Sequence, residues 1–307
     1  MNRFDELQTF VRVVETGNIS RAAESMHIAK SAVSRRLGDL EQRLGVQLFQ
    51  RTTRRLHLTS SGRSFYERAV RILSDLEEAE LAVSQQHGTL CGMLRVAVPL
   101  SFGLSHLGPA ITDFMQAHPQ IQFDLDFNDR QIDLIQEGID VAIRIAKLHD
   151  SSYIARRICS IRSVVCASAD YLDRFGMPSN PQHLQHHSCL VYSNLADRDI
   201  WRYQAPDGRA GRVKLPVFLK SNNGDYLRDA AVAGQGVILE PTFIVYSAIE
   251  QGKLVPLFPD YHWFTINAYA VYPQTRHLSQ RVRVFVDFLA QRFSGTPYWD
   301  RWLDKPV

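Results

Sequence analysis

Residues 20–49 read SRAAESMHIAKSAVSRRLGDLEQRLGVQLF, and this stretch predicts two helices joined by a tight turn. The first is short and begins at Ser20, a residue type that caps helix N-termini well. Its inward side chains would be Ala22, Ala23 and Met26. A break is expected at His27-Ile28-Ala29, where the apolar spacing stops.

The second helix is expected from about Lys30 to Leu44, with Gly45 as the residue that ends it. Its apolar stripe comprises Val33, Leu37, Leu40 and Leu44. Upstream, apolar residues recur at steps of three and four as far as Gly17, which predicts a supporting helix; they are Phe4, Leu7, Phe10, Val11 and Val14. Together the three segments predict a helix-turn-helix.

The segment from Val46 to Gly62 changes character and predicts a short β-hairpin, the wing of a winged helix-turn-helix. Leu48-Phe49 is apolar, Leu56-His57-Leu58 alternates, and three arginines lie between or beside them: Arg51, Arg54 and Arg55. A cluster of this kind would contact DNA phosphates or the minor groove. The alternative is a charged, solvated hairpin.

A long helix without Gly or Pro is expected over residues 63–87. Its apolar residues follow heptad spacing, which predicts a coiled-coil contact between two subunits: Phe65, Ala69, Ile72, Leu76, Ala79 and Val83. The alternative is an amphipathic helix packed on its own domain.

Composition supports a multi-domain globular protein of 307 residues, with 45% hydrophobic and 22% charged residues. The charge is unevenly divided: residues 1–63 hold 11 Lys/Arg against 6 Asp/Glu, 64–87 hold 2 against 5, and 88–307 hold 22 against 21. A basic first part on a nearly neutral body indicates a module for an anionic partner. No membrane span is expected, and acids near the start argue against a signal peptide, so we expect a cytoplasmic protein.

From Met93 onward, strand-like and helix-like segments alternate, which predicts α/β units with a mostly parallel sheet. Expected strands include 94–98, 121–127, 141–145, 161–166, 190–192, 213–219 and 236–239, and expected helices include 104–118, 132–137, 226–233 and 281–292. About 210 residues is long for one sheet, so two lobes with a cleft between them are expected.

The sequence resembles the LysR-type transcriptional regulators. The resemblance is densest over about 60 residues and is carried by Ser20–Ala23, Ser31–Leu37, Leu40–Phe49, Arg51 and Leu58–Gly62. It continues through Gly138–Arg144, Ala233–Val237, Pro241 and Leu278–Arg283. One departure is Ala29-Lys30, where many members carry Gln-Pro early in the recognition helix.

The resemblance implies a periplasmic-binding-protein-like body of two α/β lobes, with a small-molecule effector between them and crossing segments near 162–168 and 265–270. It also implies a homodimer or homotetramer on double-stranded operator DNA, with RNA polymerase as a further candidate partner. We therefore expect a winged helix-turn-helix domain at 1–60, a linker and dimerisation helix at 61–87, and an effector-binding domain at 88–307.

Opposite the apolar stripe of the recognition helix lie polar side chains suited to a major groove. The candidate DNA-binding residues are Ser20, Arg21, Lys30, Ser31, Ser34 and Arg35, together with the wing arginines. Arg36 lies nearer the flank, where phosphate or an acidic partner would meet it. The alternatives are a solvated polar face and, for Ser20, a cap only.

Candidate effector contacts lie beyond the carboxyl ends of strands, where open α/β sheets bind ligands. Ser101 follows the strand ending at Val98 and begins a helix, so its hydroxyl and the helix N–H groups suit an anion. The full candidate set is Ser101, Phe102, Asn128, Trp201, Arg202 and Asn223. The alternatives are a cap for Ser101, a core role for Trp201 and a turn role for Asn223. Arg144 could instead pair with a buried acid.

Other signals are weaker. His183, His186 and His187 could suggest a metal, but neighbouring Asn180-Pro181 indicates an exposed loop. Cys159 and Cys166 are expected to be buried apolar residues rather than a redox pair. No catalytic or cofactor motif is present, so no enzyme and no cofactor are expected. The rival hypothesis is a small-molecule-binding or modifying protein whose basic head is a non-specific DNA tether.

Overall fold

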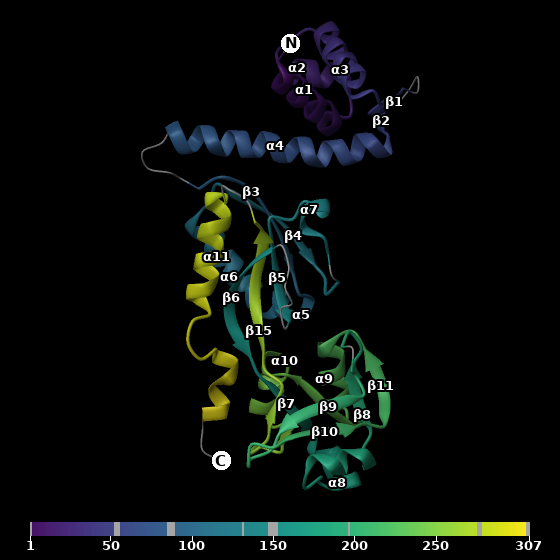
Figure 1. Cartoon of the computed structure of the whole chain (residues 1–307), viewed down its shortest axis with the longest axis vertical. Helices are drawn as coiled ribbons and strands as arrows, with labels where there is room; N and C mark the ends of the chain where they lie inside the picture. Colours follow the sequence, from purple (N-terminus) through teal and green to yellow (C-terminus); the bar gives the residue numbers. More distant parts are fainter. Residues whose placement is uncertain are drawn as a thin grey trace.

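A small N-terminal domain, one long helix and a two-lobed α/β body follow one another along the computed structural model (Figure 1). The structure describes residues 2–51, 56–84, 90–130, 132–146, 153–195, 197–274 and 278–304, and it leaves the side chains of 51, 56, 74, 75 and 77–84 undescribed. The N-terminal domain and the C-terminus lie at opposite ends of the long axis.

The N-terminal domain is the predicted winged helix-turn-helix. Three helices precede an antiparallel hairpin: α1 (Arg3–Thr16), α2 (Ile19–Ser25), α3 (Lys30–Leu44), β1 (Phe49–Arg51) and β2 (Leu56–Leu58). The recognition helix has the predicted bounds, and Gly45 ends it with a φ of 69° that L side chains rarely adopt. One correction concerns Ser20: the cap of α2 is Asn18, whose side chain accepts from the Ser20 and Arg21 N–H groups.

The three helices and the hairpin share one apolar core. Phe10 of α1 is fully buried and its ring lies 5.4 Å from Phe49 of the hairpin. The predicted stripe of α3 faces the same core, with Val33 and Leu40 fully buried. The wing is therefore packed against the helices.

Helix α4 (Ser60–Ser84) begins three residues before the predicted start at residue 63. The Thr59 hydroxyl accepts from the Gly62 N–H at 2.9 Å, which caps the first turn. A Cβ at Gly62 would lie 2.1 Å from the Leu48 carbonyl oxygen, so this close approach requires glycine. No helix in the described ranges is long and apolar enough to cross a membrane.

The first lobe of the body is a five-stranded sheet in the order β4-β3-β5-β15-β6. Its strands are β3 (Gly92–Val98), β4 (Ile121–Phe127), β5 (Val141–Ala146), β6 (Tyr153–Ile161) and β15 (Ile266–Pro273). Its helices are α5 (Leu100–Phe102), the π-helical η1 (Gly103–Leu107), α6 (Gly108–Ala117), α7 (Leu134–Glu137) and α11 (Gln280–Arg292).

The second lobe has a five-stranded sheet in the order β11-β8-β12-β7-β13 and a small sheet in the order β10-β9-β14. The larger sheet consists of β7 (Ser163–Ala167), β8 (Cys189–Tyr192), β11 (Val217–Ser221), β12 (Val237–Pro241) and β13 (Val255–Leu257), and the small one of β9 (Ile200–Gln204), β10 (Ala210–Lys214) and β14 (His262–Trp263). The helices are α8 (Ala169–Phe175), η2 (Pro181–His186), α9 (Gly224–Val232) and α10 (Thr242–Glu250). A last 3₁₀ segment, η3 (Tyr298–Asp304), ends the described chain.

The chain crosses between the lobes twice, close to the predicted places. Arg162 joins β6 in the first lobe to β7 in the second, and residues 264–265 return the chain from β14 to β15. These crossings produce antiparallel pairs, because β15 runs opposite to both β5 and β6 and β7 runs opposite to both β12 and β13. The expected mostly parallel sheet is therefore wrong: both large sheets are mixed.

Two predicted elements also need correction. The strand expected over 213–219 is split between β10 and β11, because Pro216 between them has no N–H to donate to a ladder. The helix expected over 104–118 begins earlier, at Leu100, and passes through a π-helical stretch. A Cβ at Gly103 would lie 2.9 Å from the Phe127 ring, so this stretch packs closely on β4.

Candidate functional site: a DNA-reading face and an interlobe junction

The N-terminal half of α3 presents a polar face to solvent. Lys30, Ser31, Ser34 and Arg35 are all exposed, while Val33 on the opposite side is fully buried. Because Ser31, Ser34 and Arg35 are three and four residues apart, they share one side of the helix. The structure thus brings these predicted DNA contacts together.

Two other arginines of α3 are paired with groups of α1. Arg36 donates to the Asp5 carboxylate at 3.4 Å and to the Thr9 hydroxyl at 3.3 Å. Arg43 forms an ion pair with the buried Glu6 at 2.7 Å. The acidic partner expected for Arg36 is therefore on α1, and this pairing separates structural arginines from exposed Arg35.

The start of α2 offers fewer free donors than the sequence suggested. The Asn18 side chain accepts from the N–H of Ser20 at 2.7 Å and from that of Arg21 at 3.4 Å. These N–H groups are therefore occupied, and the side chains of half-buried Ser20 and exposed Arg21 remain for a phosphate.

The wing is held by one carboxylate of α3. Glu41 Oε1 accepts from the backbone N–H groups of Leu48 at 2.8 Å and Phe49 at 3.1 Å, which fixes where β1 begins. Arg54, Arg55 and the side chain of Arg51 lie outside the described part, so their predicted contacts stay predictions.

The heptad stripe of α4 has two different environments. Ala69 is fully buried in the N-terminal core, and the Phe65 ring lies 5.3 Å from that of Phe10 in the same chain. The assignment of Ala69 to a subunit interface is corrected, because it is fully buried within its own chain, whereas Phe65 is half-buried against the same core and its part in an interface stays a prediction. Ile72 is 48% exposed and Leu76 is partly exposed, whereas the side chains of Ala79 and Val83 are outside the described part.

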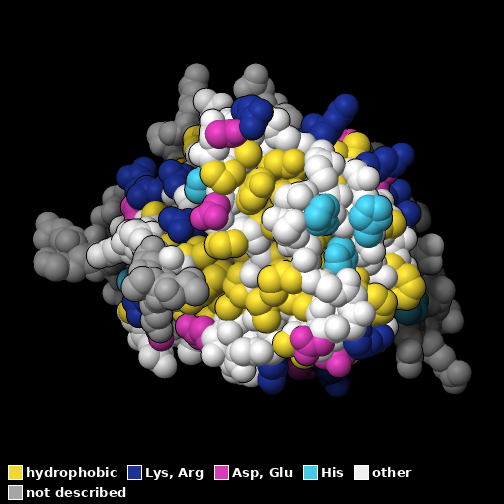
Figure 2. Space-filling view, turned by 90° about the horizontal axis from the view of Figure 1, so that it is seen from below, with side chains coloured by type: hydrophobic (Ala, Val, Ile, Leu, Met, Phe, Trp, Pro, Cys, Tyr) yellow, Lys and Arg dark blue, Asp and Glu magenta, His cyan; other side chains and the backbone are white. Residues whose placement is uncertain are grey.

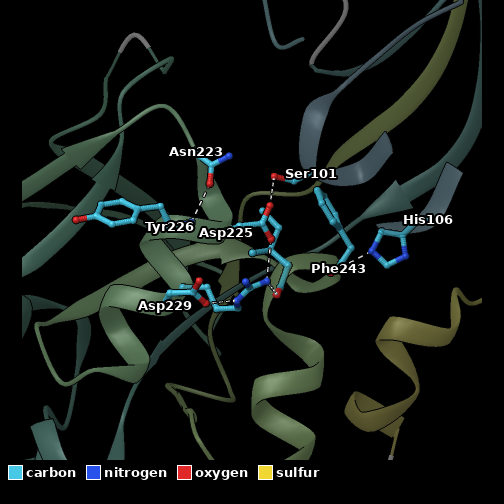
Figure 3. A network of polar contacts seen from close by, with 9 residues as sticks. Ser101, His106, Asn223, Asp225, Tyr226, Asp229 and Phe243 are labelled. Carbon is cyan, nitrogen blue, oxygen red and sulfur yellow. Dashed lines mark hydrogen bonds and ion pairs between the residues drawn. The ribbon is translucent and has the colours of Figure 1, made fainter. Parts of the chain in front are cut away.

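The two lobes meet where α5 faces α9. Ser101 at the start of α5 donates to Asp225 Oδ2 at 2.5 Å, and Asp225 lies in the first turn of α9 (Figure 3). On the same first-lobe helix, the Leu100 N–H donates to Asp129 Oδ1 at 3.2 Å. Both donors expected to receive a ligand anion are thus bound to carboxylates of this chain.

Arg228 links the same junction to the second lobe. Its guanidinium pairs with Asp225 at 2.8 Å and Asp229 at 2.9 Å, and it donates to the Ile244 carbonyl at 3.4 Å. Behind it, Glu240 on β12 is 2% exposed, and burial, reinforced by the charge of Asp225, raises its pKa to about 8. Burial therefore disfavours the charged form of this carboxyl.

Two other predicted effector residues have structural roles near this junction. Asn223 caps α9 by accepting from the Tyr226 N–H at 2.8 Å, which is the turn role named as the alternative. Asn128 is half-buried and donates to Asp126 at 2.5 Å. Arg144 donates to the Arg130 carbonyl at 2.9 Å and interacts electrostatically with Asp129.

The remaining three predicted effector residues lie in other surroundings. Phe102 is fully buried, with its ring 5.0 Å from that of Phe243. Trp201 is 6% exposed in the core of the second lobe, beside Trp263. Arg202 is exposed and pairs with Asp197 at 2.6 Å. For Phe102 and Trp201 the correction is that burial in a core leaves little surface for a ligand.

Comparisons with known proteins cover nearly the whole chain. Residues 4–63 match the family described as "Bacterial regulatory helix-turn-helix protein, lysR family", and residues 87–294 match "LysR substrate binding domain". The transcriptional regulator CrgA of Neisseria meningitidis serogroup C is 35% identical over 292 residues, which are 95% of this chain and 97% of that protein.

The chain belongs to the LysR family of transcriptional regulators. The solved structure of CrgA from Neisseria meningitidis has a TM-score of 0.61 to this regulator at 34% identity, covering 96% of this chain and all of that one. The Escherichia coli activator TtdR is 34% identical over 288 residues, covering 93% of this chain and 92% of that protein. This LysR-type regulator combines a DNA-binding helix-turn-helix domain with an effector-binding domain, and it is not an enzyme.

His183, His186 and His187 differ in their surroundings. His183 and His186 are exposed, whereas His187 is buried and interacts with the Tyr171 hydroxyl at 3.3 Å. Seen from below, the end of the second lobe shows histidines at the surface beside a gathering of hydrophobic side chains (Figure 2). Among the described residues no group of His, Cys, Asp and Glu is arranged to hold a metal ion.

The cysteines of the regulator are free thiols, and Cys159 and Cys166 are buried as predicted. Burial raises the pKa of Cys159 to about 12 and raises that of Cys166 still further. Because the thiolate is the reactive form, neither residue is activated for redox chemistry in this conformation.

Sequence reasoning missed Asp225, Arg228 and Glu240. Asp225 has the position of an ordinary acidic residue in a first helical turn, and Glu240 ends a strand of apolar residues, VILEP. The one local signal for Glu240 was a carboxyl group within a strand whose other residues are apolar.

Proposed function

We propose that residues 1–60 bind operator DNA through α3, that residues 61–87 join two copies, and that residues 88–307 sense an effector between the lobes. The observation that carries the proposal is the exposed face of α3, on which Ser31, Ser34 and Arg35 lie free of the ion pairs that hold Arg36 and Arg43. A helix face with hydroxyls and a guanidinium can read base edges in a major groove.

Titration of the protein with its own promoter fragment and with random DNA, in one buffer of stated salt, tests this function. We expect affinity for the promoter to exceed that for random DNA by about a thousandfold or more. Equal affinity would instead support the rival, a small-molecule-binding protein with a non-specific DNA tether.

Arg35 is the residue that we expect to contribute sequence discrimination. Arg35→Ala should cost about 1–3 kcal/mol on the operator and much less on random DNA, because a bidentate contact to a base edge is lost. Arg35→Lys should retain only part of the operator affinity, since lysine keeps the charge but lacks the planar guanidinium fork. Paired titrations measure both losses, with Gln42→Ala, exposed further along α3, as the control.

A uniform loss on both DNAs would make Arg35 a phosphate contact. Unchanged binding to both would place the reading surface on another element.

The wing arginines should act without regard to sequence. Arg51→Ala should weaken binding to operator and random DNA alike and reduce the magnitude of the salt slope by about 0.9, because one phosphate contact is lost. Salt titrations measure the slope, and Gln50→Ala, which removes no charge from the same strand, should leave it unchanged. The same test applies to Arg54 and Arg55, and an unchanged slope in all three variants would contradict the wing assignment.

We further propose that the effector site lies at the lobe junction beside Ser101, with Asn128 and Asn223 on its two sides. The supporting observation is that residues 124 positions apart, Ser101 and Asp225, join the lobes there through one hydrogen bond. A ligand at this contact would change the lobe geometry and, through it, the spacing of the DNA-binding domains. A homodimer or homotetramer is the proposed assembly, and RNA polymerase stays a candidate partner.

A further inference from the structure

The start of α5 is already neutralised by this chain's own carboxylates. Asp129 accepts from the Leu100 N–H at 3.2 Å, and Asp225 accepts from the Ser101 hydroxyl at 2.5 Å. Figure 3 shows the Ser101 side chain directed at Asp225 across the junction. An anionic ligand at Ser101 would have to displace one carboxylate while lying close to the other.

A third carboxyl group, that of Glu240, adds an unused acceptor. The Glu240 side chain is only 2% exposed, and its Oε1 has no hydrogen-bond partner in the described part of the chain. Its other oxygen lies against the start of α9, since a Cβ at Gly224 would be 2.8 Å from Oε2. Oε2 therefore faces the turn that carries Asp225, while Oε1 of the same carboxyl is the acceptor without a partner in the described part of the chain. A buried acceptor of this kind is costly unless something donates to it.

The two arginines nearby, Arg228 and Arg144, each already bond within this chain. Arg228 divides its guanidinium between Asp225 and Asp229, at 2.8 and 2.9 Å. Arg144 donates through Nη1 to the Arg130 carbonyl and is attracted by Asp129 and Asp126, while its buried Nη2 has no hydrogen-bond partner in the described part of the chain. The junction thus sets the carboxyl groups of Asp129, Asp225 and Glu240 against one unpaired guanidinium nitrogen among the described residues, and these carboxyl groups disfavour an anionic ligand beside them.

We propose that the effector of this regulator carries a cationic amine, and that Asp225 and Glu240 bind it at the junction of the lobes. The inference rests on the proposed function, in which this junction is the effector site. An ammonium group supplies three donors and no acceptor, which matches the unused Glu240 oxygen and the Asp225 carboxylate. In taking Asp225 from Ser101, the amine would also break the hydrogen bond that joins the lobes.

Thermal unfolding of the full-length protein with putrescine or succinate, at matched ionic strength, tests the charge preference. The two probes share a four-carbon chain and carry opposite charge. We expect putrescine to raise the Tm of the wild type and succinate to leave it unchanged, because a ligand stabilises only the state that it binds. Asp225→Asn should weaken the putrescine effect by about tenfold in affinity, the loss of one charge-assisted hydrogen bond.

Glu240→Gln provides a second, nearly isosteric variant, so the test does not depend on one substitution. Asp229→Asn is the matched control, because Asp229 pairs with Arg228 as Asp225 does but is not bonded to Ser101. It should keep the putrescine effect. Circular dichroism without ligand checks that all variants fold.

Three results would overturn the inference. Stabilisation by succinate and not by putrescine would mean that the junction selects anions, and the proposed effector role of the junction would stand. An equal putrescine effect in the wild type and all variants would place the amine elsewhere. No effect of either probe would remove the amine preference, while the promoter titration would still decide the regulatory function separately.

Discussion

Trp299→Ala should lower the free energy of unfolding of the regulatory domain by about 3–5 kcal/mol, the usual cost of removing a buried aromatic side chain. Trp299 is fully buried, and its ring lies 5.7 Å from that of Phe102 in the first lobe and 6.4 Å from that of Phe243 in the second. The neighbouring Asp300 pairs with Arg162, the crossing residue, at 3.8 Å. The segment at Trp299 and Asp300 therefore contacts both lobes and one of the two crossings between them.

Urea unfolding followed by far-UV circular dichroism measures this loss without using tryptophan fluorescence. Leu303→Ala is the control, because Leu303 is in the same segment but is 38% exposed and should cost far less. Equal, small losses of unfolding free energy in both variants would show that the segment is not part of the domain core. The result matters for this chain because residues beyond 294 lie outside the match to the LysR substrate-binding domain.

The sequence predicted the elements whose pattern is periodic and local. Helix α3 was placed at its observed bounds because Val33, Leu37 and Leu40 recur on one face and Gly45 ends it. Strand β4 also has its predicted bounds, Ile121–Phe127. In such segments the residues that form the element also determine which side is buried.

Elements without such a pattern were missed. Helix α10 is TFIVYSAIE, apolar on most sides because it is buried among the lobes, and a short apolar run does not distinguish a helix from a strand. Strand β15 pairs with β5 and β6, which are more than a hundred residues earlier, so its pairing has no local signal. The antiparallel pairs in both mixed sheets were missed for the same reason.

The candidate effector site shows a similar limit. The position of Ser101 at a strand end was predictable, because β3 and the helix after it form one unit. Its partner Asp225 was not, because their contact depends on how two lobes pack. The expected anionic ligand was inferred from the start of the helix at Ser101 alone. That inference could not take account of the carboxylates that the fold places beside Ser101.

Helix α4 illustrates that a heptad stripe predicts an apolar face without naming its partner. In the first turns the stripe is covered by α1 of the same chain, so Phe65 and Ala69 belong to the N-terminal core. Further along, Arg71 donates to the Ile135 carbonyl at 3.0 Å, which ties α4 to the first lobe. Directly after Arg71, Ile72 is left 48% exposed, and such a large apolar side chain on a long helix is available to a second copy.

Ile72→Asp should therefore separate the subunits and lower operator affinity by about a hundredfold or more. A carboxylate in an apolar interface is costly, and a monomer loses the gain from binding two half-sites at once. Leu76→Asp, one helical turn further on, should act in the same way. Light scattering gives the assembly, and titration with the operator gives the affinity.

Ser64→Asp is the matched control, because it adds the same charge to an exposed polar position of α4 and should preserve the dimer. Since Ile72 is exposed within one chain, its replacement should leave the fold of that chain intact, so a loss of DNA binding would report assembly. Intact dimers with unaltered operator affinity in the Ile72 and Leu76 variants would contradict an α4 interface. The subunit contact would then have to be made by the regulatory domain, and the exposed part of the α4 stripe would need another explanation.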